Sequence, residues 1–112
     1  MFMVLDPETI REQLASRLAE LQVRAAHVHA ARIEPVNPDS SEAATEKEDD
    51  EVLEGEEALI MLEIAAVRAA ISRLDAGTYG VCARCGQGID PRRLGVQHEA
   101  ALCLSCATSL YD

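Results

Sequence analysis

Four cysteines in the last third of the chain constrain the fold more than any other feature. They form two Cys-x-x-Cys pairs, Cys82/Cys85 and Cys103/Cys106, and the chain has no other cysteine. Each pair can direct two thiolates at one ion without strain, and zinc prefers a closed tetrahedron of soft ligands. The sequence therefore predicts one structural Zn²⁺ ion held by Cys82, Cys85, Cys103 and Cys106.

Two other uses of paired cysteines fit the sequence less well. Disulfides would require a secreted domain, but residues 1–6 lack the basic and apolar regions of a signal peptide. A redox site would require a strand–helix pattern, which neither pair has. His98 is a rival ligand that we expect to be a surface histidine, and we expect no ligand role for His27 or His29. The chain is expected to be cytoplasmic, with no membrane span.

Composition and charge exclude several function classes. The 112 residues include three aromatics and no Trp, while Ala and Leu dominate, which is typical of long packed helices. Ten of the 20 acidic residues lie between positions 39 and 57, a stretch with one basic residue, Lys47. Such acidity disfavours direct sequence-specific DNA binding, which needs clustered Lys and Arg. The sequence has no Ser/His/Asp set and no glycine-rich phosphate loop, and a four-cysteine site leaves no open metal position. We therefore do not expect an enzyme.

The first predicted helix begins after Asp6-Pro7, since Asp is a good capping residue and Pro suits the first helical position. Apolar residues then recur at alternating steps of four and three, the spacing of a coiled-coil seam: Leu14, Leu18, Leu21, Ala25 and Val28. The pattern ends at Glu34-Pro35, and Asn37-Pro38 predicts a turn.

A second helix is predicted by a longer apolar pattern. Its members are Leu53, Ile60, Ile64, Val67, Ile71 and Leu74, with Leu59 and Leu62 expected to broaden the stripe. It ends at Asp75-Ala76-Gly77, where glycine can adopt the left-handed conformation that closes a helix. Gly55 and the like charges near it are locally unfavourable to this helix.

These patterns predict a mainly α fold: a long antiparallel α-helical hairpin (a coiled coil) followed by a C-terminal four-cysteine zinc finger. The hairpin covers residues 1–77 with its turn at about 35–41, and the finger covers residues 78–112 with a short terminal helix. We expect a monomer.

The finger segment resembles a known family. Residues 74–89, Arg93-Leu94 and residues 101–106 look like the zinc finger of the DksA/TraR proteins, and the resemblance extends through the hairpin. It implies a protein that inserts its coiled coil into the secondary channel of bacterial RNA polymerase and modulates transcription initiation.

The resemblance also implies a functional tip. The family pattern Asp-x-x-Asp-x-Ala aligns with Asp39-Ser-Ser-Glu42-Ala-Ala44, so Asp39, Glu42 and Ala44 are the predicted partner-binding residues. Glu42 replaces the second Asp, which keeps the charge and adds one methylene.

A departure from the family concerns guanosine tetraphosphate. Where family members that respond to it carry basic residues, this chain has Ala66, Gln97 and Ala107. An anionic nucleotide needs Lys or Arg, so we expect a weak or absent response unless Arg92 or Arg93 substitutes.

The leading hypothesis is therefore a non-enzymatic transcription regulator that acts on RNA polymerase. One alternative is a zinc-finger adaptor that binds another protein. A second is a thiol-based zinc sensor, in which Arg84 beside Cys85 lowers a thiol pKa.

Overall fold

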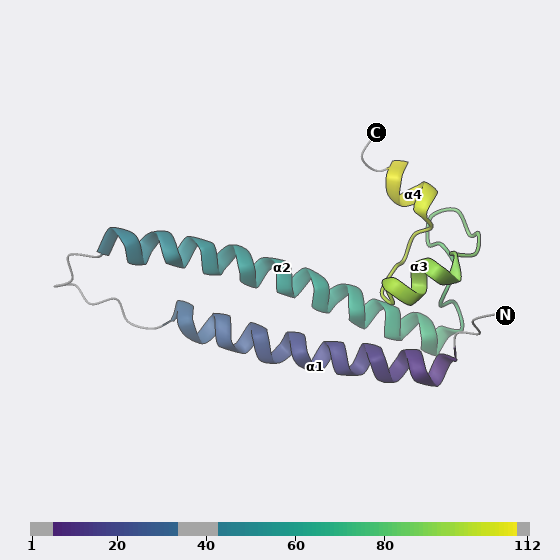
Figure 1. Cartoon of the computed structure of the whole chain (residues 1–112), viewed down its shortest axis with the longest axis horizontal. Helices are drawn as coiled ribbons and strands as arrows, with labels where there is room; N and C mark the ends of the chain where they lie inside the picture. The colour runs from purple at the N-terminus through teal and green to yellow at the C-terminus, as the bar shows by residue number, and fades with distance from the viewer. Residues whose placement is uncertain (1–5, 34–42, 110–112) are drawn as a thin grey trace. The chain divides into compact units, whose positions relative to one another are not determined.

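The computed structural model describes residues 6–33 and 43–109. This part of the chain forms four helices, α1 (Pro7–Arg32), α2 (Ala43–Ala76), α3 (Pro91–Val96) and α4 (Leu104–Ser109), and one isolated antiparallel β-bridge between Val81 and Gly88 (Figure 1). The chain divides into two compact units, residues 1–18 with 65–112 and residues 19–64. Each unit contains a stretch of α1 and a stretch of α2 that run antiparallel. The predicted fold class, mainly α with paired long helices before the cysteines, is confirmed.

The start of α1 is fixed by the cap that the sequence predicts. The Asp6 carboxylate accepts hydrogen bonds from the Glu8 amide (3.3 Å) and the Thr9 hydroxyl (2.8 Å). Pro7 occupies the first helical position, where its missing N–H leaves no intrahelical bond unmade. A capping side chain of this kind typically contributes about 1 kcal/mol to helix stability.

In the unit of residues 19–64, the predicted seam packs as expected. Leu21 on α1 is buried, as are Ile60 and Ile64 on α2. Arg32, the last residue of α1, donates a hydrogen bond to the Glu57 carboxylate on α2, and His29 lies 3.2 Å from the same carboxylate. The apolar seam and these polar contacts hold the two helices together in this unit.

The prediction that Leu59 and Leu62 broaden the buried stripe is wrong, because both side chains are exposed. Their exposed fractions are 69% and 68%, against 6% for Ile60. Each residue advances an α-helix by about 100°, so Leu59 lies about 100° and Leu62 about 200° around α2 from Ile60. They therefore lie outside the face of α2 that packs on α1.

In the unit of residues 1–18 and 65–112, the beginning of α1 packs on the end of α2. Four buried residues form this contact region: Ile10, Leu14, Val67 and Ala70. An ion pair between Arg11 and Asp75 (2.7 Å) adds a polar tie at the surface. Pairs this exposed contribute little stability, so apolar burial supplies most of the packing energy here.

The end of α2 also follows the prediction. Ala76 is its last residue, and Gly77 adopts φ +75°, the left-handed conformation that few other residues tolerate. The Thr78 amide then donates to the Arg73 carbonyl (2.9 Å), which satisfies a carbonyl at the helix end. This turn leads directly to the first cysteine pair.

The predicted tip falls on residues that the structure does not describe. Asp39, Glu42 and the predicted turn at about 35–41 lie outside the described residues, and Ala44 is described only as backbone of α2. Among the described helices, none combines the length and the apolar character needed to cross a membrane.

Candidate metal centre

The first Cys-x-x-Cys pair lies on a tight backbone turn. The Cys82 amide donates to the Gln87 carbonyl (2.7 Å), and the Gly86 amide donates back to the Cys82 carbonyl (2.9 Å). Gly80 and Gly86, on either side of the pair, adopt φ +86° and +77°. These conformations favour glycine, which explains why both ends of the turn carry that residue.

The second pair lies at the start of α4. Cys103 precedes the helix and Cys106 is in its first turn, where the Cys106 amide donates to the Cys103 sulfur (3.5 Å). The Ala107 amide donates to the Cys103 carbonyl (2.9 Å), and the Ala83 amide donates to the Ala101 carbonyl (2.8 Å). The last of these bonds joins the turn of the first pair to the segment just before the second pair.

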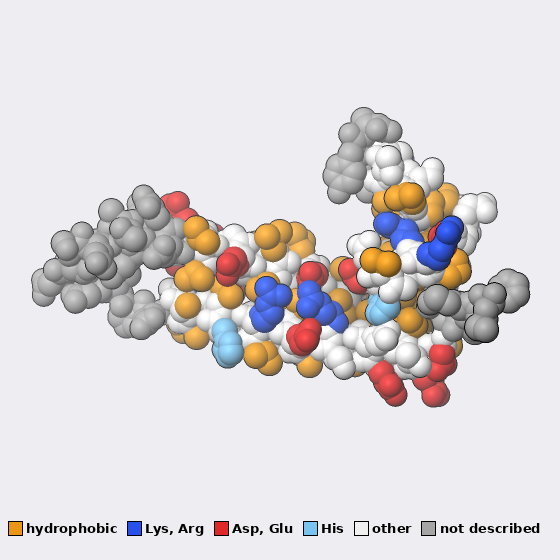
Figure 2. Space-filling view, viewed as in Figure 1, with side chains coloured by type: hydrophobic (Ala, Val, Ile, Leu, Met, Phe, Trp, Pro, Cys, Tyr) orange, Lys and Arg blue, Asp and Glu red, His pale blue; other side chains and the backbone are white. Residues whose placement is uncertain are grey.

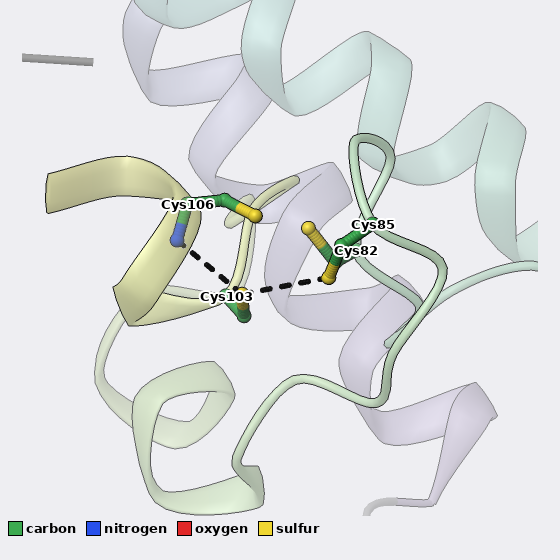
Figure 3. Close-up of side chains that lie close together, drawn as sticks. All are labelled: Cys82, Cys85, Cys103 and Cys106. Atoms are coloured by element: carbon green, nitrogen blue, oxygen red, sulfur yellow. Dashed lines mark hydrogen bonds between the residues drawn. The ribbon is translucent and has the colours of Figure 1, made fainter. Parts of the chain in front are cut away.

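The four thiol groups converge on one point (Figure 3). The Sγ atoms of Cys82, Cys85, Cys103 and Cys106 all lie within 4.8 Å of one another. The Cys85 and Cys103 sulfurs are 3.8 Å apart, and all four cysteines are free thiols rather than disulfides. Sulfurs at 2.3 Å from a tetrahedral zinc ion are themselves about 3.8 Å apart, whereas a disulfide needs about 2.05 Å. The arrangement therefore fits a zinc ion and not a pair of disulfides.

Hydrogen bonds around the four sulfurs shift the pKa values of two thiols in opposite directions. Hydrogen bonds from the backbone of Cys103 and then Cys85 lower the pKa of the Cys82 thiol to about 6. Hydrogen bonding with Cys103, together with burial, raises the pKa of Cys106 to about 12. Four thiolates in such a small volume are unfavourable without a positive ion, and zinc binding would release the remaining protons.

A small cluster of buried apolar residues packs next to the cysteines and includes Cys82 itself. Cys82, Ile89, Leu94 and Ala100 are buried together, and the half-buried Tyr79 packs against them. The Tyr79 hydroxyl donates to the His98 carbonyl (2.7 Å). Because this cluster is small, we expect a bound metal ion to contribute directly to the folding of the segment.

His98 is half-buried and is occupied elsewhere. Its Nδ1 lies 2.6 Å from the Leu94 carbonyl, which makes that nitrogen a donor to the end of α3. Among the described residues, the four cysteines form the one group of His, Cys, Asp or Glu side chains that could hold a metal ion, and no histidine belongs to it.

Sequence reasoning named Arg84 only as a neighbour of Cys85, and it missed the hydrogen bonds by which Arg84 and Arg73 support the site. Arg84 donates to the Ser109 hydroxyl (2.7 Å), which donates to the Cys106 carbonyl (3.0 Å), so these side chains connect both cysteine pairs. Arg73 at the end of α2 reaches the Glu99 carbonyl (3.2 Å). Both contacts join residues at least 25 positions apart, so no local pattern signals them.

Paired helices followed by converging thiols define a class of small helical proteins with a four-cysteine zinc finger. The chain belongs to the DksA/TraR family: residues 77–112 match the prokaryotic DksA/TraR C4-type zinc finger, and residues 10–74 match the DnaK suppressor protein-like N-terminal domain. Zinc is the metal of such fingers, and the four clustered cysteines agree with it.

Two solved structures are similar to the chain over nearly its whole length. DnaK suppressor protein from Agrobacterium tumefaciens C58 is 32% identical, with a TM-score of 0.66 and coverage of 97% of each chain. Transcription factor DksA2 from Pseudomonas aeruginosa is 22% identical, with a TM-score of 0.78, covering 94% of this chain and 82% of the other. At 22% identity, the similarity to DksA2 is a similarity of fold. A comparison with curated proteins found no significant match.

Proposed function

We propose that the chain is a non-enzymatic bacterial transcription regulator that inserts the acidic end of its paired helices into the secondary channel of RNA polymerase. The observation that carries this proposal is membership of the DksA/TraR family, which rests on matches to both the helical part and the finger. Transcription factor DksA2 from Pseudomonas aeruginosa has the same fold, which agrees with a regulatory role.

The charge of the unit of residues 19–64 agrees with such a partner. Its described part of α2 carries five acidic residues within eight positions: Asp50, Glu51, Glu54, Glu56 and Glu57. A channel that admits anionic nucleotides has cationic walls and magnesium, and an acidic stretch of helix has the charge that complements both. The proposed tip residues Asp39, Glu42 and Ala44 precede this stretch in the sequence.

The tip is tested by removing its charge without changing its size. We expect Asp39→Asn with Glu42→Gln to abolish the effect on promoter output in transcription with purified polymerase, while zinc content and polymerase binding stay at wild-type values. Glu51→Gln, which removes one acid outside the tip pattern, is the control and should keep the effect. Full activity of the double variant would refute the role of the tip.

We further propose that Cys82, Cys85, Cys103 and Cys106 are the zinc ligands and that the ion is structural. Four protein ligands close the tetrahedron and leave no position for a reacting water. Cys103→Ser should lower bound zinc well below one ion per chain, measured by metal analysis after purification. His98→Gln should retain the metal, and a loss equal to that of Cys103→Ser would mean that the ligand set is wrong.

The response to guanosine tetraphosphate is proposed to be weak or absent. Ala66, Gln97 and Ala107 offer no charge for an anionic nucleotide. Arg92 is paired with Asp90, whose carboxylate lies 3.0 Å from its guanidinium, and Arg93 donates its Nε–H to the Leu102 carbonyl (3.0 Å). Both arginines are thus already engaged. Transcription assays with and without the nucleotide should give the same promoter output, and a several-fold difference would contradict this assignment.

A further inference from the structure

The outer side of α2 carries an apolar row that is exposed in the described part of the chain. In the unit of residues 19–64 it consists of Val52, Gly55, Leu59 and Leu62, here named the outer stripe. Its three large side chains are 63%, 69% and 68% exposed, and Figure 2 shows hydrophobic side chains at the surface over α2. Single exposed apolar residues are ordinary. Successive steps of three, four and three, however, repeat the spacing by which a helix packs against a partner.

Gly55 is the second observation on this face. It lies within α2, where glycine lowers helix stability, and nothing lies within 4 Å of a Cβ built on it. Its missing side chain therefore relieves no contact within the described part of the chain. It leaves the middle of the outer stripe flat, which permits close approach of another backbone or side chain.

A groove adjoins the outer stripe. It lies between the two helices and is lined by Arg24 of α1 and by Glu56, Leu59, Ile60 and Glu63 of α2. Its volume is about 160 Å³. That is the volume of about five water molecules, which suffices for one aliphatic side chain of a partner. Leu59 belongs to both the stripe and the groove, so the two form one continuous surface.

The charges around this surface indicate the chemistry of its partner. Glu51 borders the stripe on one side and Glu56 on the other, and Arg24 is the basic residue of the groove. A second copy would place acids against acids in a chain of net charge −10, which disfavours self-association. A surface with aliphatic side chains between Lys or Arg residues complements both the apolar row and its rim.

We propose that the outer stripe and its groove form a docking surface for a basic-rimmed aliphatic patch on the wall of the polymerase channel. This assignment rests on the function proposed above. It gives affinity to the side of the helical pair and leaves the regulatory effect to the tip. Affinity and effect should therefore separate by mutation.

The decisive variant is Leu59→Ser with Leu62→Ser in the full-length, zinc-loaded protein. Both side chains are exposed, so the helical circular dichroism should be unchanged. The dissociation constant for purified RNA polymerase should rise about tenfold to hundredfold, while the effect on transcription at saturating protein is kept. Met61→Ser is the matched control, because Met61 is 52% exposed on a different side of the same helix. It should bind like the wild type.

A second variant tests the flat centre of the stripe. Gly55→Gln adds a good helix former where the chain has open space, so the melting temperature should not fall, yet binding to polymerase should weaken. A loss of binding without a loss of stability cannot come from unfolding.

Several outcomes would overturn the proposal. Unchanged affinity of the double serine variant would remove the docking role and leave the tip function intact. A wild-type dimer that the double variant converts to monomer, measured by sedimentation, would assign the surface to a second copy. A wild-type protein that does not bind polymerase at all would refute both this partner and the proposed function.

Discussion

The Glu57 carboxylate contacts two basic side chains of α1. Arg32 donates a hydrogen bond to it, and His29 Nδ1 lies 3.2 Å away. Arg32 also lies 3.8 Å from Asp50. The hydrogen bond from Arg32 is the main reason that the pKa of Glu57 is held below its ordinary value of 4.5. A single side chain of α2 thus contacts both His29 and Arg32, the basic residues in the last turn of α1.

This arrangement predicts a pH dependence of stability. Because the pKa of Glu57 is lower in the folded chain than in the unfolded chain, its stabilising effect is complete above about pH 4.5. The effect is lost as the pH falls through the folded-state pKa. Glu57→Gln should therefore melt below the wild type at pH 7, and the two melting temperatures should converge in acid.

The matched control is Glu51→Gln, an exposed acid on the same helix with no ion pair among the described contacts. Its melting temperature should follow the wild type at every pH. A gap between wild type and Glu57→Gln that persists undiminished at pH 3 would show that the carboxylate acts through packing and not through its charge.

At the scale of single elements, burial separates leucines that look alike in the sequence. Leu14 on α1 is 1% exposed, whereas Leu59 on α2 is 69% exposed. Leu14→Ala should lower the free energy of unfolding by about 2–5 kcal/mol, because it leaves a cavity in a packed seam. Leu59→Ala should change it by less than about 0.5 kcal/mol. Denaturant unfolding followed by circular dichroism measures both, and equal losses would contradict the packing described here.

The same comparison shows how far the sequence could predict the elements. Helix ends at Asp6 and Gly77 were predictable because capping and left-handed glycine act locally. The repeat of apolar residues along the seam was predictable, but the number of apolar residues around the helix that the seam buries was not. Leu59 and Leu62 fit an apolar stripe by type, and only the three-dimensional position of α1 decides that they face away from it.

The site shows a similar division. The convergence of four cysteines was predictable because Cys-x-x-Cys spacing has few other uses in such a chain. The contacts of Arg73 with the Glu99 carbonyl and of Arg84 with Ser109 were not, since each joins segments far apart in sequence. Pairings of this kind depend on the folded backbone and leave no periodic signal.

At the scale of the whole molecule, the long helices α1 and α2 and the segment with the four cysteines should differ in their need for metal. Helices α3 and α4 have six residues each, which is too short to be stable alone. The buried residues of α1 and α2 include no thiol. Removing zinc with a chelator should therefore expose residues 78–109 to protease while most helical circular dichroism remains, and added zinc should restore protection.

Mass spectrometry of the fragments locates the cleavage sites. Early cleavage inside α1 after chelation would contradict this expectation, because it would mean that the long helices also depend on the ion. Treatment with the chelator already saturated with zinc is the control and should leave the digestion pattern unchanged.

The contact between Arg32 and Glu57 also bears on how the chain can vary in length. These residues are 25 positions apart, and residues 43–56 of the intervening segment already belong to α2. Doubling the length of a flexible connection adds only about 0.6 kcal/mol of closure entropy. Insertions between residue 33 and the start of α2 should therefore leave the contact of Arg32 with Glu57 and the register of the seam undisturbed, so that this part of the chain tolerates changes in length.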